Sequence, residues 1–413
     1  AMVASEAGRA RAFQDLLAAG NVGVVKKYVD DSVKIGFVNR GNAPSLSGED
    51  ILDIVRQRKS TVVEYMMTER DLFVWIITPQ GRVDMIRHPL DRNALRETVD
   101  TLVKLVEPVS CTAEERKERA NQLTQTLRSL YTFLIEPIPE RLLPDNPVEP
   151  VTIVPYEELF RVPFNVLIDK NGKYFIDKHA LAFSSAVSVL RNTHENKAKL
   201  QASDNFRLLA VVNPKPLPEA GVGQLDETEA GFKNLLKFYP ETRREDVLIG
   251  GDASKENLKN RLQAGGHSVI FFGTHGDIND TDVLQSCIMM ARLDGGKEQE
   301  DGKLRIADIF NLDLRSDLSI LSACGTGRGS LSPDGVNGLS RAFFLGGSAT
   351  LMTSLWSIPE KMSIQQVYEF TEYWREKGLS KANALRTTQL NAMRSYPDQP
   401  EIWASFQLYG EWE

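Results

Sequence analysis

Apolar residues recur at helical spacing in the first part of the chain. Phe13, Leu16 and Leu17 follow an Ala- and Arg-rich run, and this pattern predicts a helix within residues 1–30. Ser47-x-x-Asp50 is typical of a capped helix start, so a second helix is predicted from that point. A polar loop that contains Gly, Asn and Pro separates the two predicted helices.

After residue 60 the apolar pattern shortens to the period of strands. Segments rich in Val, Ile and aromatic residues predict an antiparallel meander of three strands: Thr61–Met66, Leu72–Thr78 and Arg82–Arg87. Two longer helices are predicted next, at 91–106 and 112–135. Three further strands are predicted at Val151–Val154, Tyr174–Ile176 and Leu181–Phe183, and a helix at Ala186–Leu200.

From about residue 205, short apolar strands alternate with helical segments. The predicted strands are 207–212, 247–249, 268–272, 288–291, 319–323 and 349–354. The predicted helices are 226–238, 254–264, 337–345, 361–377 and 381–392. This alternation predicts an α/β fold with a mostly parallel sheet that helices cover on both faces. Ligands of such sheets bind at the carboxyl ends of the strands.

Composition narrows the classes of function. Net charge is -7 without a long basic run, which argues against direct nucleic-acid binding. The longest apolar stretches, such as Ala349–Leu355, are too short for a membrane span, and no secretory signal is expected before the fold. Three cysteines make no disulfide framework, so we expect a reducing, cytoplasmic location. With no Cys-x-x-Cys or Cys/His cluster, we expect neither a metal nor a cofactor.

Two reactive side chains follow apolar strands and are flanked by glycine. His275 lies in Ile270-Phe271-Phe272-Gly273-Thr274-His275-Gly276, and Cys324 lies 49 positions later in Ile320-Leu321-Ser322-Ala323-Cys324-Gly325. If the two strands are parallel neighbours, their ends bring the side chains together. A thiol needs such an imidazole to become a thiolate, because free Cys has a pKa of about 8.5. We therefore interpret Cys324 as a nucleophile and His275 as its proton-transfer partner.

Gly276 and the two other cysteines are interpreted from the residues that surround them in the sequence. Gly276 lets the backbone approach a substrate, and its N–H with that of Cys324 would form an oxyanion hole. Cys111 and Cys287 are interpreted as small buried hydrophobes. The spacing from His to Cys is similar to that of caspases, although Ser322 stands where caspases have Gln.

The chain resembles the CHAT domain, a caspase-like module found beside tetratricopeptide repeats. The resemblance rests on motifs in order along the chain: Glu6-x-x-Arg9-Ala10-Arg11, Val162-Pro163-Phe164, Thr274-His275-Gly276, Ser322-Ala323-Cys324-Gly325, Gly346-Gly347-Ser348-Ala349, Ser354-Leu355-Trp356 and Pro400-x-x-Trp403. It implies a caspase-like fold in which a degenerate caspase-like half precedes the catalytic half. It also implies three parts: 1–45 as the end of a repeat array, 46–200 as the degenerate half, and 201–413 as the catalytic half.

The resemblance further implies a cysteine endopeptidase that acts on a protein partner and is controlled by upstream tetratricopeptide repeats. Ser322, Ser354 and Trp356 occupy positions that border the substrate pocket in caspases, and packing at strand ends is an equal alternative for them. A non-catalytic interaction module and a Cys hydrolase or acyltransferase that is not a peptidase are the other functions considered. Three loops are expected to be mobile: Asp277–Asp282, Gly295–Gly302 and Gly325–Asp334.

Overall fold

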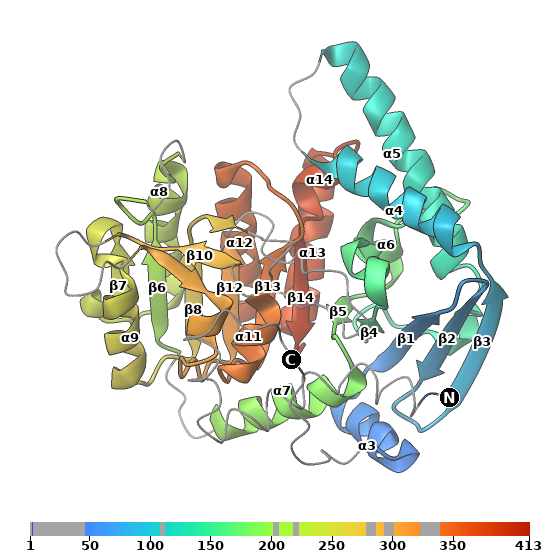
Figure 1. Ribbon diagram of the computed structural model, residues 1–413, viewed down its shortest axis with the longest axis horizontal. Coiled ribbons are helices and arrows are strands. Elements are labelled where there is room, and N and C mark those ends of the chain that lie inside the picture. Colours follow the sequence, from blue (N-terminus) through green and yellow to red (C-terminus); the bar gives the residue numbers. More distant parts are fainter. Residues whose placement is uncertain are drawn as a thin grey trace.

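The computed structural model describes Met2 and residues 46–107, 112–200, 206–217, 223–277, 286–292, 301–322 and 339–413. Eleven strands of this described part form one twisted sheet with helices packed around it (Figure 1). Their order is β3-β2-β1-β4-β5-β14-β13-β12-β8-β6-β7. Neighbours pair in parallel except at β3/β2, β2/β1 and β14/β13. The predicted α/β fold with a mostly parallel sheet is confirmed.

The predicted meander forms one end of the sheet. Its strands are β1 (Thr61–Met67), β2 (Asp71–Ile77) and β3 (Val83–Pro89). Helix α3 (Gly48–Arg58) precedes it and begins with the predicted capping box of Ser47 and Asp50. The remaining elements of this part are α4 (Arg92–Val106), α5 (Ala113–Leu134), β4 (Val151–Val154), α6 (Phe175–Lys178), β5 (Leu181–Phe183) and α7 (Val187–Leu200).

The alternating region supplies the other end of the sheet. Its strands in that sheet are β6 (Leu208–Val212), β7 (Val247–Ile249), β8 (Val269–Gly273), β12 (Leu318–Ser322), β13 (Thr350–Ser354) and β14 (Phe406–Gly410). Its helices are α8 (Asp226–Leu235), α9 (Lys255–Ala264), α10 (Ile306–Ile309), α11 (Leu339–Leu345), α12 (Glu360–Arg375), α13 (Lys381–Ser395) and α14 (Pro400–Trp403). A separate small antiparallel sheet contains β9 (Gly276–Asp277), β10 (Cys287–Met289) and β11 (Lys303–Arg305).

Both faces of β6 and β8 are buried, which explains why these two strands carry no polar side chain. Along β8, Ile270 and Phe272 join one core, whereas Val269 and Phe271 join the core on the opposite face. The first core includes side chains of α9, α10 and α11, and the second includes side chains of α8, α12 and α13. A strand covered on both sides has no polar face, so its sequence does not alternate.

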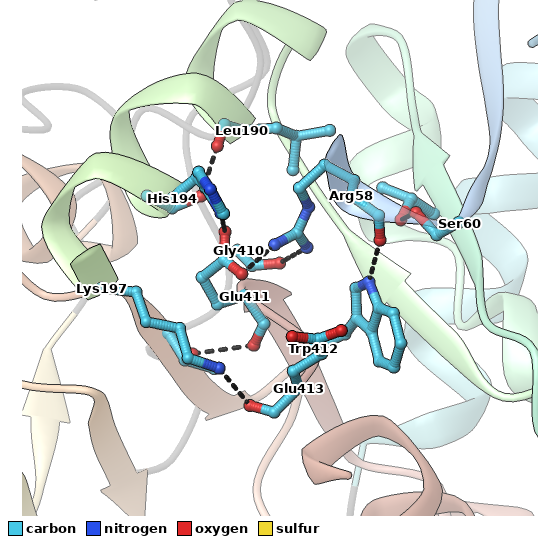
Figure 2. Close-up of polar contacts among 12 residues, drawn as sticks. Arg58, Ser60, Leu190, His194, Lys197, Gly410, Glu411, Trp412 and Glu413 are labelled. Atoms are coloured by element: carbon cyan, nitrogen blue, oxygen red, sulfur yellow. Dashed lines mark hydrogen bonds and ion pairs between the residues drawn. The ribbon is translucent and has the colours of Figure 1, made fainter. Parts of the chain in front are cut away.

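The last strand joins the two ends of the sheet. β14 pairs with β5 on one side and with β13 on the other. The residues that follow it lie against Arg58 at the end of α3 and against α7, as Figure 2 shows. Arg58 donates to the carbonyl of Gly410 at 2.7 Å and forms a buried ion pair with Glu411. The predicted division at residue 200 stays a prediction.

One predicted strand is wrong. Tyr174–Ile176 was expected to be extended, but Phe175–Lys178 forms the single turn of α6. Tyr174 makes only an isolated bridge to Ile168, and the carboxylate of Asp177 accepts from the Tyr174 N–H at 3.0 Å, which favours the turn. The helix predicted within residues 1–30 and its apolar positions lie, apart from Met2, outside the described residues.

Candidate active site

The strands that carry the two predicted catalytic motifs are parallel neighbours. β8 and β12 pair from Leu318 with Val269 to Ser322 with Gly273. His275 and Cys324 each come two positions after that last pair of residues. The strand arrangement expected from the sequence is therefore present, while Cys324 itself and the glycines after it lie outside the described residues.

The small sheet of β9, β10 and β11 fixes the backbone around His275 through hydrogen bonds. The hydroxyl of Thr274 donates to the carbonyl of Met289 at 2.6 Å, and the Met289 N–H donates to the carbonyl of His275 at 2.8 Å. Gly276 is then opposite Ile288 in the β9–β10 ladder. The backbone on either side of the imidazole is thus fixed by β10, which the sequence predicted only as an apolar strand.

A backbone carbonyl sets the orientation of the imidazole. His275 Nε2 lies 2.8 Å from the carbonyl oxygen of Gly223. Because a carbonyl oxygen can only accept, Nε2 carries the hydrogen in this contact. The neutral ring then has its free lone pair on Nδ1, which is the nitrogen able to take a proton. Nothing in the sequence around Gly223 identified this contact.

The residues predicted to border a substrate pocket are all buried. The Ser322 hydroxyl lies 2.7 Å from the hydroxyl of Ser363 on α12. Ser354 ends β13 opposite Phe406. The indole N–H of Trp356 donates to the Glu401 carbonyl at 2.7 Å. These contacts hold Ser322 and Trp356 in place, and a role in substrate binding stays a prediction for all three.

The other predicted features fall partly outside the described residues. Cys287 is fully buried in β10, in accord with its interpretation as a small hydrophobe, whereas Cys111 is not described. Most of the three loops expected to be mobile is likewise not described. Within the described ranges, no group of three or more His, Cys, Asp or Glu side chains could hold a metal ion.

A cavity of about 480 Å³ lies away from these strands. It is bounded by the end of α5, the loop after it and α6, and Tyr131, Phe175 and His179 are among its lining residues. Among the described residues, none of those predicted to be catalytic or substrate-binding lines it. The cavity is therefore separate from the described part of the candidate active site.

Comparisons with known proteins find one family model and two curated relatives. A family model described as the CHAT domain matches residues 124–411. Tetratricopeptide repeat protein 28 of Mus musculus is 23% identical over 436 residues, which covers 91% of this chain and 16% of that protein. Its Homo sapiens counterpart is 22% identical over 389 residues, covering 81% of this chain and 15% of that protein. The chain thus spans about a sixth of the length of these curated relatives.

A solved structure shows a similar fold. A chain in the crystal structure of the Saccharomyces cerevisiae separase–securin complex superposes with a TM-score of 0.56 and 13% sequence identity. The match covers 88% of this chain and 31% of that chain. At this identity the similarity concerns the fold, and it confirms the expected caspase-like architecture. A search of the described residues finds no helix long and apolar enough to cross a membrane.

Proposed function

We propose that this chain, which belongs to the CHAT domain family, is a cysteine endopeptidase that cleaves a protein partner. Cys324 is the nucleophile and His275 is its proton-transfer partner. The observation that most supports this assignment is the register of β8 and β12, whose last paired residues each precede one of the two reactive side chains by two positions.

The proposed reaction uses the free nitrogen of His275. Nδ1 takes the thiol proton of Cys324, and the thiolate attacks the carbonyl carbon of the scissile peptide bond. The backbone N–H groups of Gly276 and Cys324 donate to the developing oxyanion. The imidazolium gives its proton to the leaving amine as the C–N bond breaks, and water then hydrolyses the thioester with His275 as base.

Ser322, Ser354 and Trp356 are proposed to border the pocket for the substrate residue that precedes the cleaved bond. The hydrogen bonds of Ser322 with Ser363 and of Trp356 with Glu401 would fix the walls of that pocket. A reducing compartment such as the cytoplasm would keep the nucleophilic thiol reduced.

Labelling and substitution test the catalytic assignment. An iodoacetamide probe should label Cys324 in preference to Cys111 and Cys287, because only a thiolate reacts quickly. Cys324→Ala should lower peptide cleavage by about 10³-fold or more with an unchanged melting temperature. Cys287→Ala is the matched control and should keep its activity. Preferential labelling of another cysteine, or cleavage by Cys324→Ala at the wild-type rate, would contradict the proposal.

The names of the curated relatives suggest how the activity is controlled. Both are tetratricopeptide repeat proteins, and this chain matches only about a sixth of their length. We therefore propose that repeats upstream of this domain regulate it. The rate of cleavage of a short peptide should differ between this domain alone and a longer protein that includes its repeats. Equal rates would mean that the repeats do not act on the catalytic site.

A further inference from the structure

Asn213 occupies the strand end beside the one that leads to His275. It is the first residue after β6, it is 2% exposed, and its backbone has φ +47°. β6 and β8 are parallel neighbours, and the Asn213 N–H donates to the carbonyl of Gly273 at 2.9 Å. The backbone of Asn213 is therefore attached to the residue two positions before His275.

The side chain of Asn213 organises the start of α8. Its Oδ1 accepts from the Leu225 N–H at 2.8 Å, and its Nδ2 donates to Asp226 at 3.1 Å and to Glu229 at 3.0 Å. Leu225 is the N-cap of α8, and its side chain has no oxygen to accept the N–H groups left open there. Asn213 Oδ1 accepts the N–H of this N-cap residue, while the Thr228 N–H in the first turn donates to Glu360 on α12 at 3.2 Å. A residue from the neighbouring strand end thus helps to fix the start of α8.

Electrostatics fit this arrangement. The amide donor of Asn213 is the main cause that lowers the pKa of Glu229 below its usual value. For Asp226, the hydrogen bond with Lys215 is the larger cause of a lowered pKa, and Asn213 is the next. Both carboxylates therefore stay ionised and keep accepting from Asn213 at neutral pH.

The contact between Asn213 and Leu225 lies only two residues from Gly223, which contacts His275. Gly223 is two positions before Leu225, and its carbonyl oxygen lies 2.8 Å from His275 Nε2. Asn213 consequently fixes both the strand that leads to His275 and the segment that orients its imidazole. We propose that Asn213 is a positioning residue, which holds the Gly223 carbonyl so that His275 keeps its hydrogen on Nε2 and its free lone pair on Nδ1.

This inference rests on the proposed function for its kinetic consequences, but the orientation of His275 can be measured without activity. Long-range ¹H–¹⁵N spectra of the imidazole nitrogens report which nitrogen carries the hydrogen, and a His275→Gln sample assigns the signals. Wild-type protein should show neutral His275 protonated on Nε2. A neutral His275 protonated on Nδ1 in the wild type would overturn the inference.

Asn213→Gly is the sharpest substitution, because glycine keeps the left-handed backbone and removes the side chain that contacts Leu225, Asp226 and Glu229. We expect it to mix the two tautomers, to lower kcat by about 10- to 100-fold and to change KM by less than about threefold. The pH profile of Cys324 alkylation should shift to higher pH, because the imidazolium loses its carbonyl acceptor. An unchanged tautomer and pH profile in this variant would overturn the inference.

Two further variants separate positioning from general loss of stability. Lys215→Met removes the other partner of Asp226, leaves the contact with Leu225 intact, and should behave like the wild type. If Asn213→Gly does not fold, the isosteric Asn213→Asp takes its place. Its carboxylate would oppose Asp226 and Glu229, so the same shift is expected. Adding Glu229→Gln should restore the tautomer and the pH profile, and failure to restore them counts against the inference.

The two proposals fail in different ways. Absence of cleavage and of selective Cys324 labelling in the wild type would contradict the proposal of an endopeptidase. The imidazole spectra would still test the role of Asn213. An active wild type whose His275 does not respond to Asn213→Gly would sink only the positioning role.

Discussion

His179 is a buried histidine whose Nδ1 has no hydrogen-bond partner among the described residues. Burial, assisted by the charges of Lys178 and Arg386 and opposed by Glu140, lowers the pKa of His179 to about 4. The folded protein therefore holds a neutral ring, while an unfolded chain binds a proton below about pH 6.5.

Because of His179, the free energy of unfolding should consequently decrease as the pH is lowered. Above pH 6.5 the neutral ring costs no stability. Between pH 6.5 and pH 4 the unfolded chain binds a proton that the folded protein does not, so the loss of unfolding free energy grows as the pH falls. Below pH 4 the loss levels off. At pH 5 the loss is about 2 kcal/mol of unfolding free energy. Denaturant unfolding at pH 7.5 and at pH 5 gives the change in unfolding free energy between the two pH values. This change should be about 2 kcal/mol smaller for His179→Phe than for the wild type. An equal difference in both proteins would mean that His179 is charged in the fold.

At the same scale, the sequence identified reactive side chains but not the backbone groups around them. His275 and Cys324 stood out because each follows an apolar strand and is flanked by glycine. The Gly223 carbonyl did not, because every residue carries a carbonyl and only the fold selects one. Asn213 is an intermediate case: it follows the strand β6 as His275 follows β8, and the same argument about strand ends could have singled it out.

Helices α8 and α12 approach each other closely at Gly231. A Cβ at that position would lie 2.7 Å from Cγ1 and 2.9 Å from Cγ2 of Ile364, which is itself buried. Gly231→Ala should therefore cost about 1–3 kcal/mol of unfolding free energy through overpacking. Combining it with Ile364→Ala should cost less than the sum of the two single changes, since the new methyl group enters the space that is vacated.

Gly48→Ala is the matched control for this close approach. Gly48 also lies in a helix, but a Cβ there would meet no atom within 4 Å. It should leave stability unchanged or raise it by about 0.4–1 kcal/mol. Chemical denaturation measures all four variants, and additive losses for Gly231→Ala and Ile364→Ala would show that the helices separate freely.

Elements were predictable where the local pattern was long or doubly buried. The meander, α4, α5 and the strands β6, β8, β12 and β13 follow the predicted segments closely. β14 (Phe406–Gly410) was missed because the polar Gln407 interrupts its apolar run and its partners, β5 and β13, lie far away in the sequence. α6 was mistaken for a strand because a run of three or four apolar residues fits either period.

On the scale of the whole molecule, one continuous sheet contains strands from both sides of the division predicted at residue 200. β14 closes the gap between β5 and β13, and the residues after it contact the end of α3 (Figure 2). The Trp412 indole N–H donates to the Arg58 carbonyl at 2.8 Å, and Lys197 on α7 donates to the Glu413 carbonyl at 3.1 Å. Elements from both ends of the described chain therefore share one polar junction.

The ion pair of Arg58 and Glu411 is the buried centre of this junction. Their side chains are 2% and 3% exposed, so removing one partner leaves the other charge buried without compensation. Arg58→Met or Glu411→Gln alone should each cost about 3–5 kcal/mol of unfolding free energy. Arg58 also donates to Gly410, so its removal should be the more costly of the two.

The double variant decides whether these costs come from the pair. Arg58→Met with Glu411→Gln removes both charges, so no uncompensated charge remains, and the loss should be clearly smaller than the sum of the single losses. The Glu411 carboxylate also lies 3.7 Å from His194 Nδ1, a partly exposed neighbour that can retain a contact with the glutamine. Denaturant unfolding of the four proteins gives the coupling energy directly. Strictly additive losses would show that Arg58 and Glu411 stabilise the junction independently and that the ion pair does not tie the end of α3 to β14.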